Sequence, residues 1–235
     1  MYPVVVIPTY NERQNLAALV TALFLVPEVR LLVVDDGSPD GTGEEAERLA
    51  AASDGRLSVM HRTGPRGLGR SYIDGFKWAL AAGATHIVQM DADLSHDPAD
   101  VPRLLHESEA ADLVLGSRYV PGGQLHNWPV HRLLLSEFAN YYVRAITRMP
   151  IRDCTSGFRC WRGDLLRRIP LDAIVSEGYA FQVELAWEAH RAGGRISEIP
   201  IHFVERREGV SKMSGRVIAE SALLPWRLVA RPRRG

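Results

Sequence analysis

Cysteine, long apolar runs and an excess of charge of one sign are all scarce in this sequence of 235 residues. Cys154 and Cys160 are its two cysteines, and their spacing fits neither a zinc site nor a disulfide framework, so we expect a reducing, cytosolic setting. No window approaches the roughly 18 successive apolar residues that a membrane span needs. Lysine and arginine total 28, as do aspartate and glutamate, which excludes an overall attraction for nucleic acid. An anionic ligand would therefore have to meet a local basic patch.

Alternating strand and helix patterns fill the first half of the chain. The run PVVVIP at residues 3–8 is typical of a strand buried on both faces, and Leu16, Leu19, Val20 and Leu23 follow at helical spacing. The alternation recurs as far as Ser117, without the basic and apolar regions of a signal peptide at its start. We therefore predict an α/β fold with a mostly parallel sheet flanked by helices, whose functional groups gather at the carboxyl ends of the strands.

The second half is less regular and ends in a basic tail. We expect helices over residues 133–148 and 179–192, and Pro200 indicates an edge strand or a break between two strands. The prediction is one domain over residues 1–215, followed by an amphipathic and basic tail over 216–235. Two interpretations of that tail stay open: attachment to an anionic membrane surface, or a packed terminal helix with a frayed basic end.

The motif MDADLSHDP offers a candidate metal site. Asp91 and Asp93 follow a predicted strand, and carboxylate oxygens suit Mg²⁺ or Mn²⁺ that also bridges a substrate's phosphates. The alternative is a turn in which Asp97 caps the next helix. A second acidic cluster, VVDDGSPDGT, ends a neighbouring predicted strand, and two such clusters repel each other unless a cation or a hydrogen-bond donor lies between them. That arrangement favours the metal site.

Several basic residues are candidates for binding an anion, although each of them, taken singly, is better explained as solvated surface. They are Arg118, Arg132 with Ser136 one helical turn later, and Arg206 and Lys212 in a loop rich in glycine and serine. The segment GTGEEA at residues 41–46 matches a dinucleotide fingerprint, but the acidic residues around it oppose a pyrophosphate and favour a simple turn.

In order, the chain carries VVIPTYNE, VVDDGSPDGTG, GLGRSYIDGF, MDADLSHDP, GSRYVPGG, TSGF, EGYAFQVEL and GVSKMSG. This series, which covers residues 4–215, resembles the inverting GT-A glycosyltransferases of family two, and most closely the polyprenyl (dolichyl) phosphate mannose synthases. The resemblance implies a Rossmann-like GT-A domain that transfers mannose from GDP-mannose to a polyprenyl phosphate with inversion. It also implies Mg²⁺ or Mn²⁺ as cofactor, and a membrane subunit of the kind on which some relatives rely. The apolar and basic residues of the tail predict peripheral contact at the cytoplasmic face of a membrane.

The same resemblance implies roles for individual residues. The residues that would contact the donor are Pro8, Tyr10, Glu12, Val34, Asp36, Ala92, Arg206 and Lys212. Asp91 and Asp93 would bind the metal and the diphosphate. Arg118, Arg132 and Ser136 match positions that receive the acceptor phosphate. Some relatives have a metal-binding glutamine where this chain has Ser95, and the position of Asp153 before the TSGF turn suggests an auxiliary acid or metal contact.

Three other functions compete with this one. A UDP-sugar donor would keep the fold and the reaction class. A receiver-like or phosphatase-like domain, suggested by VVDD at a strand end, would leave the residues after Ser117 unexplained. A non-catalytic sugar-nucleotide binder would not need both Asp91 and Asp93 together with the basic residues.

Overall fold

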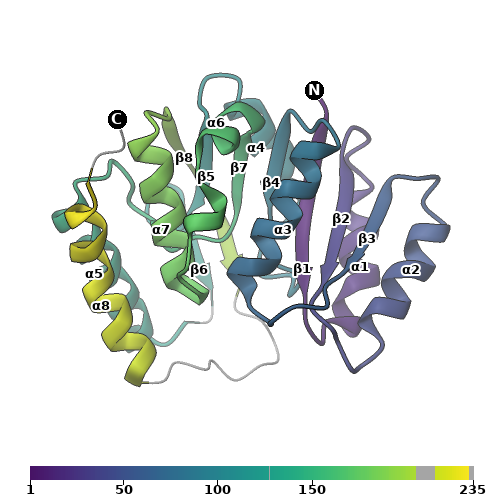
Figure 1. The fold of residues 1–235 in the computed structure, drawn as a ribbon, viewed down its shortest axis with the longest axis horizontal. Coiled ribbons are helices and arrows are strands. Elements are labelled where there is room, and N and C mark those ends of the chain that lie inside the picture. Colours follow the sequence, from purple (N-terminus) through teal and green to yellow (C-terminus); the bar gives the residue numbers. More distant parts are fainter. Residues whose placement is uncertain (127, 205–214, 233–235) are drawn as a thin grey trace.

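A seven-stranded sheet forms the centre of the computed structural model, which describes residues 1–126, 128–204 and 215–232 (Figure 1). In spatial order its strands are β3 (Leu57–His61), β2 (Arg30–Asp35), β1 (Pro3–Thr9), β4 (His86–Gln89), β7 (Arg159–Arg162), β5 (Leu113–Ser117) and β8 (Ile196–Pro200). The pairings are parallel except for those of β7, which runs antiparallel to both of its neighbours. The predicted mostly parallel sheet is thus confirmed.

Helices cover both faces of this sheet, as the buried residues of β1 require. Val4 and Val6 join the core on one face, beneath α3 (Leu68–Ala81), α6 (Gly163–Arg168) and α7 (Gly178–Arg191). Val5 and Ile7 join the core on the opposite face, beneath three further helices. Those are α1 (Arg13–Leu23), α2 (Thr42–Ala51) and α4 (Val101–Glu107). Because side chains alternate along a strand, an unbroken apolar run fits a strand that is covered on both sides.

The break predicted at Pro200 is confirmed. Strand β8 ends at this residue, and β9 (His202–Val204) pairs with β6 (Gln124–His126) in a separate two-stranded sheet.

The reversed direction of β7 brings two loops together, because the amino end of β7 lies at the same edge of the sheet as the carboxyl ends of β4 and β5. The TSGF turn before β7 therefore meets the loop that follows β5, and the hydroxyl of Ser156 donates a hydrogen bond to the carbonyl of Gly116 at 2.6 Å.

Two helices lie side by side at one end of the sheet, α5 (Val130–Thr147) and α8 (Gly215–Ala230) (Figure 1). Leu224 and Leu228 of α8 enter the same hydrophobic core as the sheet, and the Arg231 guanidinium then lies 2.6 Å from a carboxylate oxygen of Glu184. The described part of the predicted tail is therefore a packed helix. Within the described ranges, no helix combines the length and the apolarity that a membrane crossing requires.

Candidate active site

A cavity of about 250 Å³ opens at the carboxyl ends of β1, β2 and β4. These ends adjoin because β1 pairs with both other strands, in a register that places Thr9 opposite Asp35. Residues predicted to contact the donor or the metal make up most of its wall: Pro8, Tyr10, Glu12, Asp36, Asp91, Ala92 and Asp93. Thr9, Leu68 and Ser71 complete it. Four segments far apart in the sequence are thus brought to one site.

The remaining predicted donor contacts lie elsewhere. Val34 is fully buried, and its side chain packs toward Gly75 of α3, so it supports the cavity from within the core and does not line it. The alternating pleat of β2 explains this, since Val34 points into the sheet core and the following residues reach the strand end. Arg206 and Lys212 lie outside the described residues.

Each of the two aspartates after β4 has one oxygen held by a neighbour. The Tyr72 hydroxyl donates to Oδ1 of Asp91 at 2.7 Å, and the Ser95 backbone N–H and hydroxyl donate to Oδ1 of Asp93 at 3.1 and 2.6 Å. Complete burial and the charge of Asp91 raise the pKa of Tyr72 well above its ordinary value, so the phenol stays a neutral donor. Between the two aspartates and the next helix, Leu94 adopts a φ of 59°, a conformation that is uncommon outside functional turns.

The residues of this cavity suit a divalent cation that is bound partly by the protein and partly by the substrate. Asp91 and Asp93 offer hard carboxylate oxygens on the wall of a cavity. Among the described residues there is no group of three His, Cys, Asp or Glu side chains that would enclose a metal by itself. Ser95 supports Asp93 by hydrogen bonds. Such a pair of carboxylates suits Mg²⁺ or Mn²⁺, whose remaining positions go to phosphate oxygens and water.

Arg62, from the loop after β3, is a site residue that the sequence analysis missed. Its guanidinium forms ion pairs with Asp36 and with Asp74, the latter at 2.7 Å, and Gly67 N–H donates to the other Asp36 oxygen at 2.8 Å. Arg62 thus supplies part of the positive charge that two neighbouring acidic clusters require. The basic segment RTGPRGLGR directly after a predicted strand was the signal that could have identified it. Arg66, in the same segment, stacks over the ring of Tyr10 at 4.6 Å.

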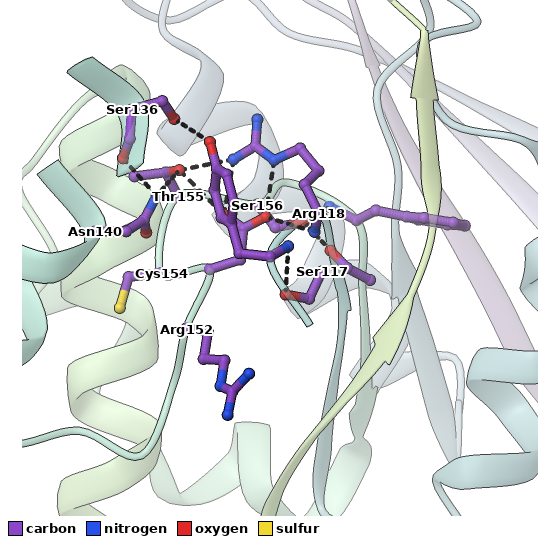
Figure 2. Close-up of polar contacts among 12 residues, drawn as sticks. Ser117, Arg118, Ser136, Asn140, Arg152, Cys154, Thr155 and Ser156 are labelled. Carbon is purple, nitrogen blue, oxygen red and sulfur yellow. Dashed lines mark hydrogen bonds and ion pairs between the residues drawn. The ribbon is translucent and has the colours of Figure 1, made fainter. Parts of the chain in front are cut away.

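Arg118 and Asp153 form a buried ion pair. Figure 2 shows Arg118 beside Thr155, to whose hydroxyl it donates at 2.8 Å. Asp153 accepts hydrogen bonds from Arg118 at three atoms, Nη2 at 2.7 Å, Nε at 2.8 Å and the backbone N–H at 3.0 Å. Burial alone would raise the pKa of Asp153, but the charge and hydrogen bonds of Arg118 outweigh it and hold this pKa below its ordinary value. This geometry argues against Asp153 as an auxiliary acid or a metal contact, because the carboxylate is fully buried and paired with Arg118.

Two aromatic residues bring the predicted acceptor residues together. The guanidinium carbons of Arg118 and Arg132 lie 5.6 and 4.2 Å from the ring centroid of Trp128, and the Tyr119 hydroxyl donates to Ser136 Oγ at 2.7 Å. Neither aromatic residue was predicted as part of the site. The two cations share one aromatic ring although they lie on different segments.

His96 connects the acidic cavity with this basic cluster. Its ring stacks on Phe158 with centroids 4.9 Å apart and meets the edge of Phe203 at 5.6 Å, and Arg118 lies over that same Phe203 ring. Burial lowers the pKa of His96, and its Nδ1 accepts a long hydrogen bond of 3.5 Å from the Asp91 backbone N–H. The neutral imidazole therefore separates the acidic and basic groups without adding charge.

Comparisons with known proteins agree with this arrangement. The family model described as glycosyl transferase family 2 matches residues 4–175. The chain is 51% identical over 219 residues to polyprenol monophosphomannose synthase of Mycolicibacterium smegmatis, covering 92% of this chain and 83% of that protein. It is 48% identical over 229 residues to undecaprenyl-phosphate mannosyltransferase of Micrococcus luteus, covering 96% and 94%.

Solved structures share the fold at lower identity. One is glucosyl-3-phosphoglycerate synthase from Mycobacterium tuberculosis in complex with Mn²⁺, UDP-glucose and phosphoglyceric acid, with a TM-score of 0.73, 19% identity and coverage of 99% of this chain and 81% of that one. Another is a mannosyltransferase from Pyrobaculum calidifontis in complex with GDP-mannose and Mn²⁺, with a TM-score of 0.65, 18% identity and coverage of 100% and 65%.

Proposed function

The chain belongs to glycosyltransferase family 2, and from that premise we propose that it transfers mannose from GDP-mannose to a polyprenyl phosphate, giving polyprenyl-phosphate mannose and GDP. The observation that carries the proposal is the juxtaposition of Asp91 and Asp93 with the cluster of Arg118, Arg132 and Ser136 at one edge of the sheet. The names of the two relatives support the mannosyl group and the acceptor class.

The 250 Å³ cavity would receive the nucleotide diphosphate of the donor. A divalent ion held by Asp91 and Asp93 would neutralise the charge that develops on the departing diphosphate. Tyr72 and Ser95 keep the two carboxylates in place through their hydrogen bonds, which limits rearrangement during the reaction. Arg206 and Lys212, outside the described residues, remain predicted contacts to the donor.

The acceptor phosphate would lie against Arg118, Arg132 and Ser136. Asp153 fixes the guanidinium of Arg118 through Nε and Nη2, which leaves the remaining nitrogen, Nη1, to donate to a phosphate oxygen. A phosphate oxygen attacks the anomeric carbon as the bond from that carbon to the diphosphate oxygen breaks, and this single in-line displacement inverts the configuration. Because the attacking phosphate is already anionic near neutral pH, no strong general base is required.

Exposed apolar residues on α5 and α8 support contact with a membrane. On α5 they recur at roughly helical spacing and are 52–71% exposed, an unusual density for a surface in water: Val130, Leu134, Leu135, Phe138 and Tyr141. Leu223, Trp226 and Val229 of α8 are 46–58% exposed, and the indole of Trp226 donates to the Tyr142 hydroxyl at 2.9 Å across the two helices. We place this face at the cytoplasmic surface of the membrane, where a membrane subunit would also dock.

The test is transfer of radiolabel into organic-extractable lipid by the purified full chain, with polyprenyl phosphate and Mg²⁺ or Mn²⁺. We expect label from GDP-mannose, its loss with EDTA, and its loss in Asp93→Asn. Asp97→Asn is the matched control, because it is the same substitution at a nearby aspartate that does not line the cavity and whose side chain accepts from Ala99 N–H at 2.9 Å. Label from UDP-glucose alone would keep the reaction class and replace the sugar, and full activity of Asp93→Asn would contradict the metal assignment.

A further inference from the structure

A second and larger cavity, of about 690 Å³, lies between α5 and the loops next to β5 and β7. Backbone and side chains of residues 119–123 form one wall, and α5 contributes Glu137, Asn140, Tyr141 and Arg144. Arg118 and Arg152 complete it. Figure 2 shows Arg152 apart from the hydrogen-bonded cluster of Arg118. The residues that line the nucleotide cavity are a different set, whereas Arg118 belongs both to this cavity and to the predicted acceptor cluster.

The three arginines of this cavity differ in what neutralises them. Arg118 is paired with the buried Asp153. In the part of the chain that the structure describes, the guanidinium groups of Arg144 and Arg152 have no hydrogen bond or ion pair. Glu198 lies beside Arg152, but its two carboxylate oxygens accept the backbone N–H groups of residues 152 and 153, at 2.7 and 2.9 Å. Glu137 is thus the carboxylate on the cavity wall itself.

Two guanidinium groups that line one cavity favour a phosphate ligand. Arginine presents a planar fork of N–H donors that matches phosphate oxygens, and it is weakly hydrated compared with lysine. The glycine-rich loop at 119–123 lies on the cavity wall, and a Cβ on Gly123 would lie 2.7 Å from the carbonyl oxygen of Arg118. The loop therefore has no room for a larger side chain at Gly123.

Tyr141 indicates the source of that phosphate. It is 62% exposed as part of the apolar row of α5, and it also lines the cavity. Where that row lies in a membrane interface, as proposed above, the cavity opens among lipid headgroups. We propose that this cavity binds the phosphodiester headgroup of an anionic phospholipid through Arg144 and Arg152, distinct from the acceptor phosphate at Arg118 and Arg132. This inference rests on the membrane contact in the proposed function, and its role would be to hold α5 in one orientation on the membrane.

Co-sedimentation of the full chain with vesicles tests the site, using phosphatidylcholine alone or mixed with phosphatidylglycerol and no polyprenyl phosphate. Wild type should prefer the anionic vesicles. The double variant Arg144→Gln/Arg152→Gln should bind them about 30-fold more weakly. Each basic residue near an anionic leaflet contributes about 1 kcal/mol to binding, and about 1.4 kcal/mol corresponds to a tenfold change in affinity. The single variant Arg144→Gln has a matched control in Arg148→Gln, four residues later at the C-cap of α5 and outside the cavity wall.

The outcomes separate this site from general electrostatics and from the acceptor site. An equal loss in Arg144→Gln and Arg148→Gln would overturn the proposal, because it would show a diffuse charge effect. Equal binding of wild type to phosphatidylcholine alone and to the anionic mixture would overturn the assignment to an anionic lipid. An equal loss by the double variant on neutral vesicles that carry polyprenyl phosphate would assign the cavity to the acceptor. Anionic selectivity that depends on Arg144 and Arg152 would support the site even if the wild type transfers no mannose, so the two proposals can fail independently.

Discussion

Replacing Asp153 with asparagine should destabilise the protein strongly, because it leaves Arg118 buried without a counter-charge. Asp153 is 0% exposed and the Arg118 side chain 6% exposed, and three hydrogen bonds join them. Removing one partner of such a pair costs about 3–5 kcal/mol. Each kcal/mol lowers Tm by about 2–4 °C in a domain of this size, so we expect a decrease of about 6–20 °C.

Urea unfolding followed by tryptophan fluorescence, together with thermal unfolding, measures this effect. The double variant Arg118→Met/Asp153→Leu removes both charges and should recover most of the lost stability, since an apolar pair of similar size needs no counter-ion. A near wild-type unfolding free energy for Asp153→Asn, combined with complete loss of transfer, would refute our interpretation and restore Asp153 as an auxiliary acid or metal contact.

The same pair predicts a dependence on pH. The pKa of Asp153 in the folded protein lies below its unfolded value of about 3.9, so the stabilisation is fully present above that value and is lost as the pH falls through the folded pKa. The difference in unfolding free energy between wild type and Asp153→Asn should therefore stay constant between about pH 6 and 7 and shrink in acid. A difference that grows as the pH falls would contradict the assignment.

Three further changes test other parts of the structure. Tyr72→Phe keeps the ring that stacks on Phe181 but removes the hydrogen bond to Asp91. The affinity for Mn²⁺, measured by electron paramagnetic resonance, should therefore fall about 10–100-fold. An unchanged affinity would contradict a positioning role for Tyr72. Leu228→Ala should lower the unfolding free energy by about 2–5 kcal/mol, whereas the exposed Leu223→Ala should change it by less than about 0.5 kcal/mol. Phe138→Ser should weaken vesicle binding without changing unfolding, and equal binding would remove α5 from the membrane contact.

The sequence alone predicted the architecture and half of the site, because both depend on local patterns. The apolar run of β1 requires a strand covered on both faces, and the structure provides helices on each side. Asp91 and Asp93 follow a predicted strand, and parallel strands place their carboxyl ends at one edge. Periodicity and strand ends thus locate the acidic cavity without any knowledge of long-range contacts.

The partners of charged residues could be learned only from the tertiary structure. Arg62 meets Asp36 across 26 residues, and Arg118 meets Asp153 across 35. The second pair forms because β7 runs antiparallel to its neighbours, which brings the loop before β7 to the loop after β5. No local sequence motif predicts that direction. Val34 is the opposite case. Its motif suggested a contact with the donor, but packing against α3 buries its side chain.

The surfaces of α5 and α8 illustrate the same division. Helical spacing predicts one apolar face per helix, but not whether a neighbour covers that face. Packing buries Leu224 and Leu228 of α8 and leaves Trp226 and the row on α5 exposed. A sequence pattern determines which side chains share a strand edge or a helix face, since that follows from backbone geometry. Which of them become buried, paired or available to a ligand depends on segments brought together by folding, and was decided by the tertiary structure alone.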